Sequence, residues 1–328
     1  MKIILVVFSP SVAKLNLADG LSERMPIGSV ASPPASLQAA TQEDSGLDFR
    51  VELDTKGYCI IPNVLSASDV AKARDLFFRW HATIPADDTT SQRRRRFNGI
   101  YASHGVGHAP LAWFVRTHPN VLAAFRRAWS DDDLVVSFDG CCYIEADDET
   151  KDVYWTHTDQ APSKRGRVCY QGLVALTHNR ERTLVVYEAS HRLHETYFRD
   201  RGMLEDTRDW HVLDEDFVAN LSDTKRILEV PAGALVLWDS RLFHHAQRGE
   251  PGEERLVQYV CYYPRNHHAM TADERAHRRR CFERRCTTTH WPAPMNVVSD
   301  GDGAGADGGD DKDVAVADLS LSAVHALI

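Results

Sequence analysis

The sequence predicts a mainly β protein with helical additions, in which an antiparallel β-sandwich or barrel follows helices near the N-terminus. Two observations predict the sheets: short runs rich in Val, Leu, Tyr and Cys alternate with turn-forming clusters, and no long helix separates one run from the next. Strands joined in this way form antiparallel sheets, whereas parallel sheets need helical crossovers. The expected strands lie in residues 134–143, 168–176, 184–187, 234–238 and 256–263.

Helical patterns precede these strands. A short strand and turn is expected over residues 57–65, and Ser66 with Asp69 then forms a capping-box pattern, in which a hydroxyl and a carboxylate satisfy free N–H groups at a helix start. A second helix is expected over residues 119–129, where Pro follows His at the entry. The apolar residues of the first helix share one face and predict packing on the protein body: Val70, Ala73, Phe77 and Trp80.

The remaining elements and the domain boundaries follow from composition. Two short helical insertions are expected at residues 195–200 and 214–221, and a strongly basic, solvated helix at 273–285. Residues near the N-terminus lack sustained periodicity, and a Gly-, Ala- and Asp-rich stretch near the C-terminus predicts a solvated linker. The predicted organisation is a flexible leader (1–46), a folded domain (47–298) and an acidic linker with a short C-terminal tail (299–328).

Composition excludes several classes of protein. The chain has 328 residues, 43% of them hydrophobic, and a net charge of −9, which disfavours a general nucleic-acid binder. Its apolar runs are far shorter than the roughly 18–20 residues of a membrane span. Seven cysteines without a CxxC pair fit neither a disulfide framework nor a zinc ribbon, so we expect a cytoplasmic location. The short apolar stretch at residues 3–8 leaves an N-terminal targeting segment as the alternative.

His157 and Asp159 are the first candidate metal ligands. On an extended strand, residues i and i+2 point the same way, so this spacing presents an imidazole and a carboxylate on one face. A third ligand from a distant strand would complete a 2-His-1-carboxylate triad with three open positions. Because His and Asp two residues apart are common by chance, the interpretation depends on the third ligand.

His244 is the best candidate for that third ligand. It ends a β-forming run that follows the turn signal at residues 230–233. The adjacent His245 is its rival, because neighbouring residues of a strand point to opposite faces.

Arg255 opens the strand that follows His244. A guanidinium in this place is suited to bind a dicarboxylic cosubstrate through a bidentate fork. The alternative is a surface salt bridge with Glu253 or Glu254. Together, the two histidines, the aspartate and this arginine predict a non-haem Fe(II)- and 2-oxoglutarate-dependent oxygenase.

At these residues the sequence resembles the phytanoyl-CoA dioxygenase family. The resemblance covers residues 57–292 and implies a double-stranded β-helix, a form of jelly roll, behind an N-terminal helical element. Ala189 stands where family members usually carry Gly, and residues 179–182 replace a commoner Gly-containing turn. The matching segments occur in order at residues 57–65, 133–140, 155–160, 171–174, 184–191, 238–244, 255 and 288–292.

The resemblance implies a set of roles. Fe(II) would bind His157, Asp159 and His244, 2-oxoglutarate would chelate the iron, and Arg255 would bind its distal carboxylate. Gln171, on a neighbouring strand, is a candidate second contact to the cosubstrate. With O2, the implied reaction hydroxylates a small organic substrate and releases succinate and CO2, and ascorbate is expected to support it. Related halogenases carry a small residue at the carboxylate position, so Asp159 favours hydroxylation.

Two other functions remain open. A catalytically silent jelly-roll binding protein would have no need for the complete set of four residues. A nucleic-acid-directed oxygenase would bind nucleic acid with strong salt dependence, and the long spacing between His157 and His244 disfavours it. The arginine blocks at residues 93–96 and 278–285 are expected to be solvated faces, with an anionic substrate at the first block as the alternative.

The sequence does not identify the substrate. We expect specificity to come from loops over the open end of the barrel, at residues 101–112 and 192–221. Trp155 and Phe243 are expected in the core or pocket wall. Structural or solvent roles are expected for His178, His191, His194, His267, His268, His277 and His290.

Overall fold

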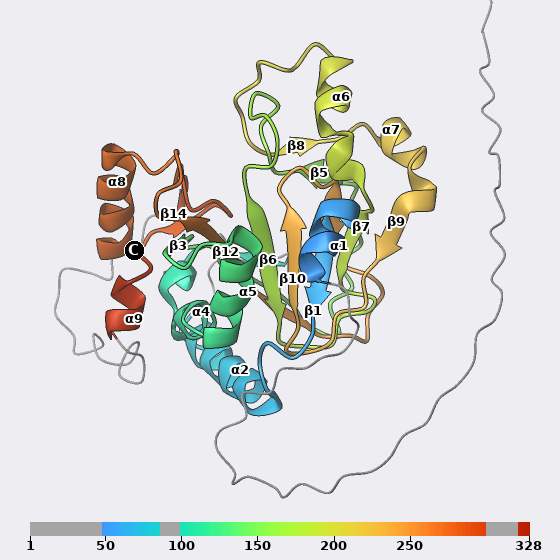
Figure 1. Cartoon of the computed structure of the whole chain (residues 1–328). Helices are drawn as coiled ribbons and strands as arrows, with labels where there is room; N and C mark the ends of the chain where they lie inside the picture. Colours follow the sequence, from blue (N-terminus) through green and yellow to red (C-terminus); the bar gives the residue numbers. More distant parts are fainter. Residues whose placement is uncertain (1–47, 86–98, 300–320) are drawn as a thin grey trace, which may run out of the picture. The chain divides into compact units, whose positions relative to one another are not determined.

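The computed structural model describes residues 48–85, 99–299 and 321–328, and this part of the chain contains two large antiparallel sheets (Figure 1). One has the strand order β1-β10-β6-β12-β4-β2, with β3 paired to β12, and the other has the order β8-β5-β11-β7-β9. The strands are β1 (Tyr58–Ile61), β2 (Ile100–Tyr101), β3 (Leu134–Val136), β4 (Cys141–Ile144), β5 (His157–Thr158), β6 (Tyr170–Ala175), β7 (Leu184–Tyr187), β8 (His211–Val212), β9 (Lys225–Ile227), β10 (Leu235–Asp239), β11 (His244–Ala246) and β12 (Arg255–Pro264). The predicted leader at residues 1–46, the arginine block at 93–96 and residues 300–320 lie outside the described residues.

Successive strands pass back and forth between the two sheets. From β4 to β7 the chain alternates between the larger and the smaller sheet, and from β9 to β12 it alternates again, starting in the smaller one. Two facing sheets connected in this way form the double-stranded β-helix, a jelly roll. The predicted fold class is therefore confirmed.

Alternate residues along the strands point into the space between the two sheets and form a buried core there. Leu173 and Ala175 of β6 share a buried cluster with Leu184 and Val186 of β7 in the opposite sheet. Val174, which lies between Leu173 and Ala175, belongs instead to the cluster formed with the helices. Both faces of β6 are therefore buried, which explains its continuous apolar sequence.

Helices cover the outer face of the larger sheet. Ser66 and Asp69 form the predicted capping box at the start of α2, and Figure 1 shows α2, α4 and α5 grouped beside β12. None of the described helices is both long and apolar enough to cross a membrane. The α-helices are α1 (Phe49–Lys56), α2 (Ala67–His81), α4 (Pro110–Arg116), α5 (Pro119–Trp129), α6 (His194–Arg199), α7 (Glu215–Ala219), α8 (Ala272–Glu283) and α9 (Leu321–His325), and short 3-10 turns are η1 (Val106–His108), η2 (Ser190–Arg192) and η3 (Ser222–Thr224).

The expectation that residues 101–112 form a substrate loop is wrong for most of that segment. Only its first residues, Tyr101 and Ala102, line the pocket described below. The rest forms η1 and the start of α4, whose residues are buried on nearly every side. A helix that is apolar all round has no amphipathic period, so periodicity alone does not reveal it.

The C-terminal elements also pack on the core. A ribbon of β13 (Thr287–Thr288) and β14 (Val297–Ser299) follows α8. Val324 of α9 and Leu327, just after that helix, belong to the main buried cluster. Arg278, expected on a solvated face of the basic helix, is fully buried. Its guanidinium donates hydrogen bonds to the carbonyl groups of Pro292, Val136 and Leu327, and so ties α8 to the sheet and the C-terminus.

A buried histidine predicts acid sensitivity of the fold. His108 is only 6% exposed, and burial lowers its pKa from 6.5 to about 3. As the pH falls below 6.5, the unfolded chain gains a proton that the folded ring does not take up, so stability is lost between these two values. We expect His108→Gln to reduce the slope of the unfolding free energy by up to about 1.4 kcal/mol per pH unit, measured by urea denaturation of the metal-free protein between about pH 7 and about pH 4. Equal slopes for His108→Gln and wild type would contradict this prediction.

Candidate metal centre

Three predicted ligands meet where two strands of the smaller sheet lie side by side. His157 of β5 is the direct antiparallel partner of His244 of β11, and Asp159 follows β5 immediately. The carboxylate lies between the two rings: its Oδ1 is 3.6 Å from His157 Nε2, and its Oδ2 is 3.5 Å from His244 Nε2. One potential ligand atom from each residue lies within 4.8 Å of the others.

Backbone carbonyl groups orient both imidazole rings. His157 Nδ1 lies 2.8 Å from the Trp155 carbonyl oxygen, and His244 Nδ1 lies 2.9 Å from the Leu242 carbonyl oxygen. Each ring donates its Nδ1–H there, which leaves the lone pair of Nε2 facing Asp159. Two imidazole nitrogens and one carboxylate on one side of a centre match the 2-His-1-carboxylate set that binds non-haem Fe(II). The residues therefore fit the predicted metal.

The protonation states at the site also suit a cation. Burial lowers the pKa of His157 below its usual value and that of His244 to about 4, so both rings are neutral ligands near neutral pH. Burial alone would raise the pKa of Asp159, but the neighbouring His157 and His244 hold it below its usual value. The carboxylate is therefore ionised.

His245 faces the other side of β11. Its Nδ1 lies 3.0 Å from Thr156 Oγ1, and its ring takes no part in the group around Asp159. The geometry thus favours His244 over His245 as the third ligand, as strand alternation requires.

We expect His244→Ala to weaken binding of Fe(II) at least about 100-fold, because loss of a group that merely supports a ligand already costs about 10–100-fold. His245→Ala should change the affinity less than about threefold, since it removes a neutral hydrogen bond outside the ligand set. Competition with a chromogenic chelator measures both. A larger loss in His245→Ala than in His244→Ala would assign the ligands the other way.

Arg255 is a fully buried cation without an acidic partner among the described residues. Its Nη1 donates to Cys142 Sγ at 3.3 Å, and its Nε has no hydrogen-bond partner. The alternative surface salt bridges do not form: Glu254 pairs with Arg74, and Glu253 pairs with Arg180. Because an unpaired buried charge is costly, this guanidinium indicates a place for an anionic ligand.

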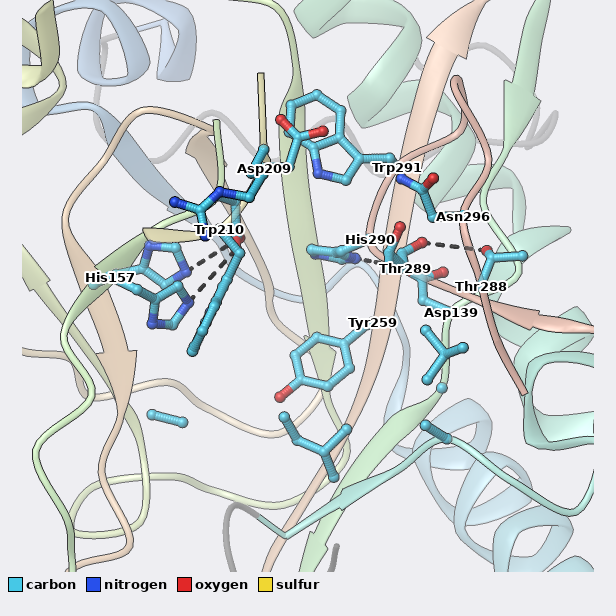
Figure 2. Close-up of a pocket in the computed structure, with 18 of the residues that line it drawn as sticks. Asp139, His157, Asp209, Trp210, Tyr259, Thr288, Thr289, His290, Trp291 and Asn296 are labelled. Atoms are coloured by element: carbon cyan, nitrogen blue, oxygen red, sulfur yellow. Dashed lines mark hydrogen bonds and ion pairs between the residues drawn. The ribbon is translucent and has the colours of Figure 1, made fainter. Parts of the chain in front are cut away.

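A cavity of about 690 Å³ opens onto the three ligands. Four tryptophans and two tyrosines are among its lining residues, and Figure 2 shows His157 and Trp210 on one side with Tyr259 and His290 on the other. Trp155 lines the cavity and Phe243 is fully buried, as predicted. The aromatic wall residues are Tyr101, Trp155, Trp210, Trp238, Tyr259 and Trp291.

Residues 53–250 match the model of a protein family described as phytanoyl-CoA dioxygenase. The chain belongs to the phytanoyl-CoA dioxygenase family. This confirms the predicted family and identifies the protein as an iron- and 2-oxoglutarate-dependent oxygenase.

The phytanoyl-CoA dioxygenase-like chain is similar to fungal and bacterial proteins. Ava biosynthesis cluster protein O of Aspergillus versicolor is 29% identical over 269 residues, which cover 75% of this chain and 86% of that protein. The structure of GlcNAc Inducible Gene 2 from Candida albicans has a TM-score of 0.52 at 16% identity and covers 66% of this chain and 62% of that chain. HygX from Streptomyces hygroscopicus, with nickel and 2-oxoglutarate bound, has a TM-score of 0.47 at 16% identity over 65% of this chain and 84% of that chain.

Gln171 lies next to the ligand set of this family member. It is buried on β6, its Nε2 donates to the His290 carbonyl oxygen at 3.3 Å, and its hydrogen bond helps to lower the pKa of Asp159. Its Oε1 has no partner. Its predicted contact with the cosubstrate stays a prediction.

His290, for which a structural or solvent role was expected, lines the pocket. The ring is held by Asp139 through Nδ1, while its Nε2 is buried without a partner. The sequence signal for this residue is the segment at residues 288–292, which resembles the family and contains His290.

Proposed function

We propose that this oxygenase hydroxylates a small organic substrate with O2 and 2-oxoglutarate, and releases succinate and CO2. The observation that carries the proposal is that His157, Asp159 and His244 come together at the wall of a cavity that several aromatic side chains also line. Asp159 supports hydroxylation over halogenation, because halogenases related to the family carry a small residue at that position.

Each residue has a defined role in this proposal. His157, Asp159 and His244 would hold Fe(II), and their neutral rings and ionised carboxylate need no proton release before the metal binds. The buried guanidinium of Arg255 would bind the distal carboxylate of 2-oxoglutarate through a bidentate fork. Gln171 would support Asp159 and contact the cosubstrate.

When bound, Fe(II) and 2-oxoglutarate supply the coupled oxidation of the cosubstrate and the substrate by O2. The chain supplies the geometry of the site. The backbone carbonyls of Trp155 and Leu242 keep the two histidines turned toward the centre. The aromatic wall residues would pack against the substrate on the open side of the triad.

Turnover of 2-oxoglutarate distinguishes this proposal from a catalytically silent binding protein. With Fe(II) and ascorbate, wild-type protein should form succinate slowly even without substrate, and faster when a substrate is found by screening. A chelator should stop the reaction. The substrate should gain the mass of one oxygen atom. Absence of metal-dependent succinate would contradict the proposed oxygenase, and a product of unchanged mass would contradict hydroxylation.

A further inference from the structure

Three buried polar atoms of pocket-lining residues lack a hydrogen-bond partner among the described residues: His290 Nε2, Thr289 Oγ1 and Trp238 Nε1. Buried polar groups are normally paired, so such a group facing a cavity points to a ligand. His290 is the most constrained of the three. Figure 2 shows its ring extending from the side of Asp139 and Thr288 toward the side of His157.

A buried chain of contacts holds the His290 ring in place. Its Nδ1 is hydrogen-bonded to Asp139, whose carboxylate accepts a second hydrogen bond from Ser137 Oγ at 2.7 Å. Arg116, fully buried, lies 3.4 Å from the same carboxylate. Because Nδ1 faces the carboxylate of Asp139, Nε2 is the ring nitrogen left to a ligand in the cavity.

Trp210 closes the cavity on the opposite side. Its side chain is exposed although it is large and apolar, and its ring centroid lies 5.8 Å from that of His157. The backbone φ of Trp210 is +68°, which is unusual for a bulky residue and favours a functional reason. Its backbone N–H donates to the Asp159 carbonyl oxygen at 3.2 Å, so the residue is anchored beside the metal centre.

The charges at the rim do not favour an ionic substrate. Among the described residues that line the cavity, the two cations are already paired: Lys164 with Asp209 at 2.7 Å, and Arg208 with Asp206 at 2.8 Å. The apolar part of the wall includes four tryptophans and two tyrosines.

We propose that the substrate is an uncharged, flat and mostly apolar ring compound whose hydroxyl or N–H group donates a hydrogen bond to His290 Nε2, with Trp210 packed against its ring. This inference rests on the proposed function and specifies its substrate class. His290 is then a positioning residue that selects which part of the ring system faces the metal centre.

Two small probes test the inference. Indole is flat and carries one N–H group, whereas benzothiophene has nearly the same shape without it. Binding of each is measured by calorimetry to the protein loaded with Fe(II) and 2-oxoglutarate, without O2. Wild type should bind indole about fivefold more tightly, which is the effect of one net hydrogen bond. His290→Phe should abolish this preference, and His290→Gln, which keeps a hydrogen-bonding group, should retain part of it. His178→Phe, the matched exposed control, should behave as wild type.

Other outcomes would overturn the inference: equal affinities in wild type, a preference that survives in His290→Phe, or no saturable binding of either probe. His290→Leu is the second variant if phenylalanine prevents folding. The same preparations are assayed for succinate formation. Turnover without an indole preference overturns only the inference, whereas an indole preference without turnover overturns only the proposed reaction.

Discussion

Replacement of His157 by alanine is expected to abolish metal-dependent formation of succinate. The substitution removes one of the three proposed metal ligands, and Asp159 and His244 alone would not hold the metal in a fixed geometry. Because weaker changes around metal ligands cost about 10–100-fold, the activity should fall at least about 100-fold. Conversion of 2-oxoglutarate to succinate with Fe(II) and ascorbate measures the effect.

His245→Ala is the matched control for this substitution, because His245 lies beside a ligand but faces the opposite side of the strand. It should retain most of the activity. Loss of a metal ligand is expected to lower the rate about 100-fold. If His157→Ala kept more than about a tenth of the wild-type rate, the assignment of the metal centre would be wrong.

Substitution of Arg255 by methionine is expected to weaken 2-oxoglutarate binding about 30-fold or more. Loss of one partner of a buried charge pair costs about 2–5 kcal/mol in binding free energy. The lower value, about 2 kcal/mol, corresponds to about a 30-fold loss of affinity. Methionine keeps most of the packing of the side-chain stem and removes only the charged group. The effect should appear in the KM for 2-oxoglutarate and in its calorimetric affinity, while binding of Fe(II) alone stays unchanged.

Two comparisons make this prediction specific. Arg255→Lys keeps the charge but not the bidentate fork, so its affinity should lie between those of wild type and Arg255→Met. Arg74→Ala removes a more exposed arginine that pairs with Glu254 and should have no effect. In the protein without cosubstrate, Arg255→Met should be at least as stable as wild type, since no acidic partner of Arg255 lies among the described residues. A variant that binds 2-oxoglutarate normally would contradict the assigned role.

Elements with local signals were predicted well from the sequence. The capping box at Ser66 and the helix Pro119–Trp129 depend on residues within a few positions of one another, and the structure contains both. The strand Leu184–Tyr187 has the expected bounds as well. Helix α4 was missed because Leu111, Trp113 and Val115 are buried on several sides, so its sequence shows no polar face. Only contacts with other elements explain why this segment is helical.

The sequence by itself predicted the residues that we propose bind the metal. The His157–Asp159 spacing puts two ligands on one face of a strand, and family-like segments in order identified His244 and Arg255. Only the tertiary structure shows which other residues these side chains contact. The choice of His244 over His245 required the pairing of β5 with β11. The missing acidic partner of Arg255 and the position of His290 in the pocket depend on residues far apart in the chain. Spacing along a strand follows from backbone geometry, whereas burial and pairing across a jelly roll arise only when distant strands come together.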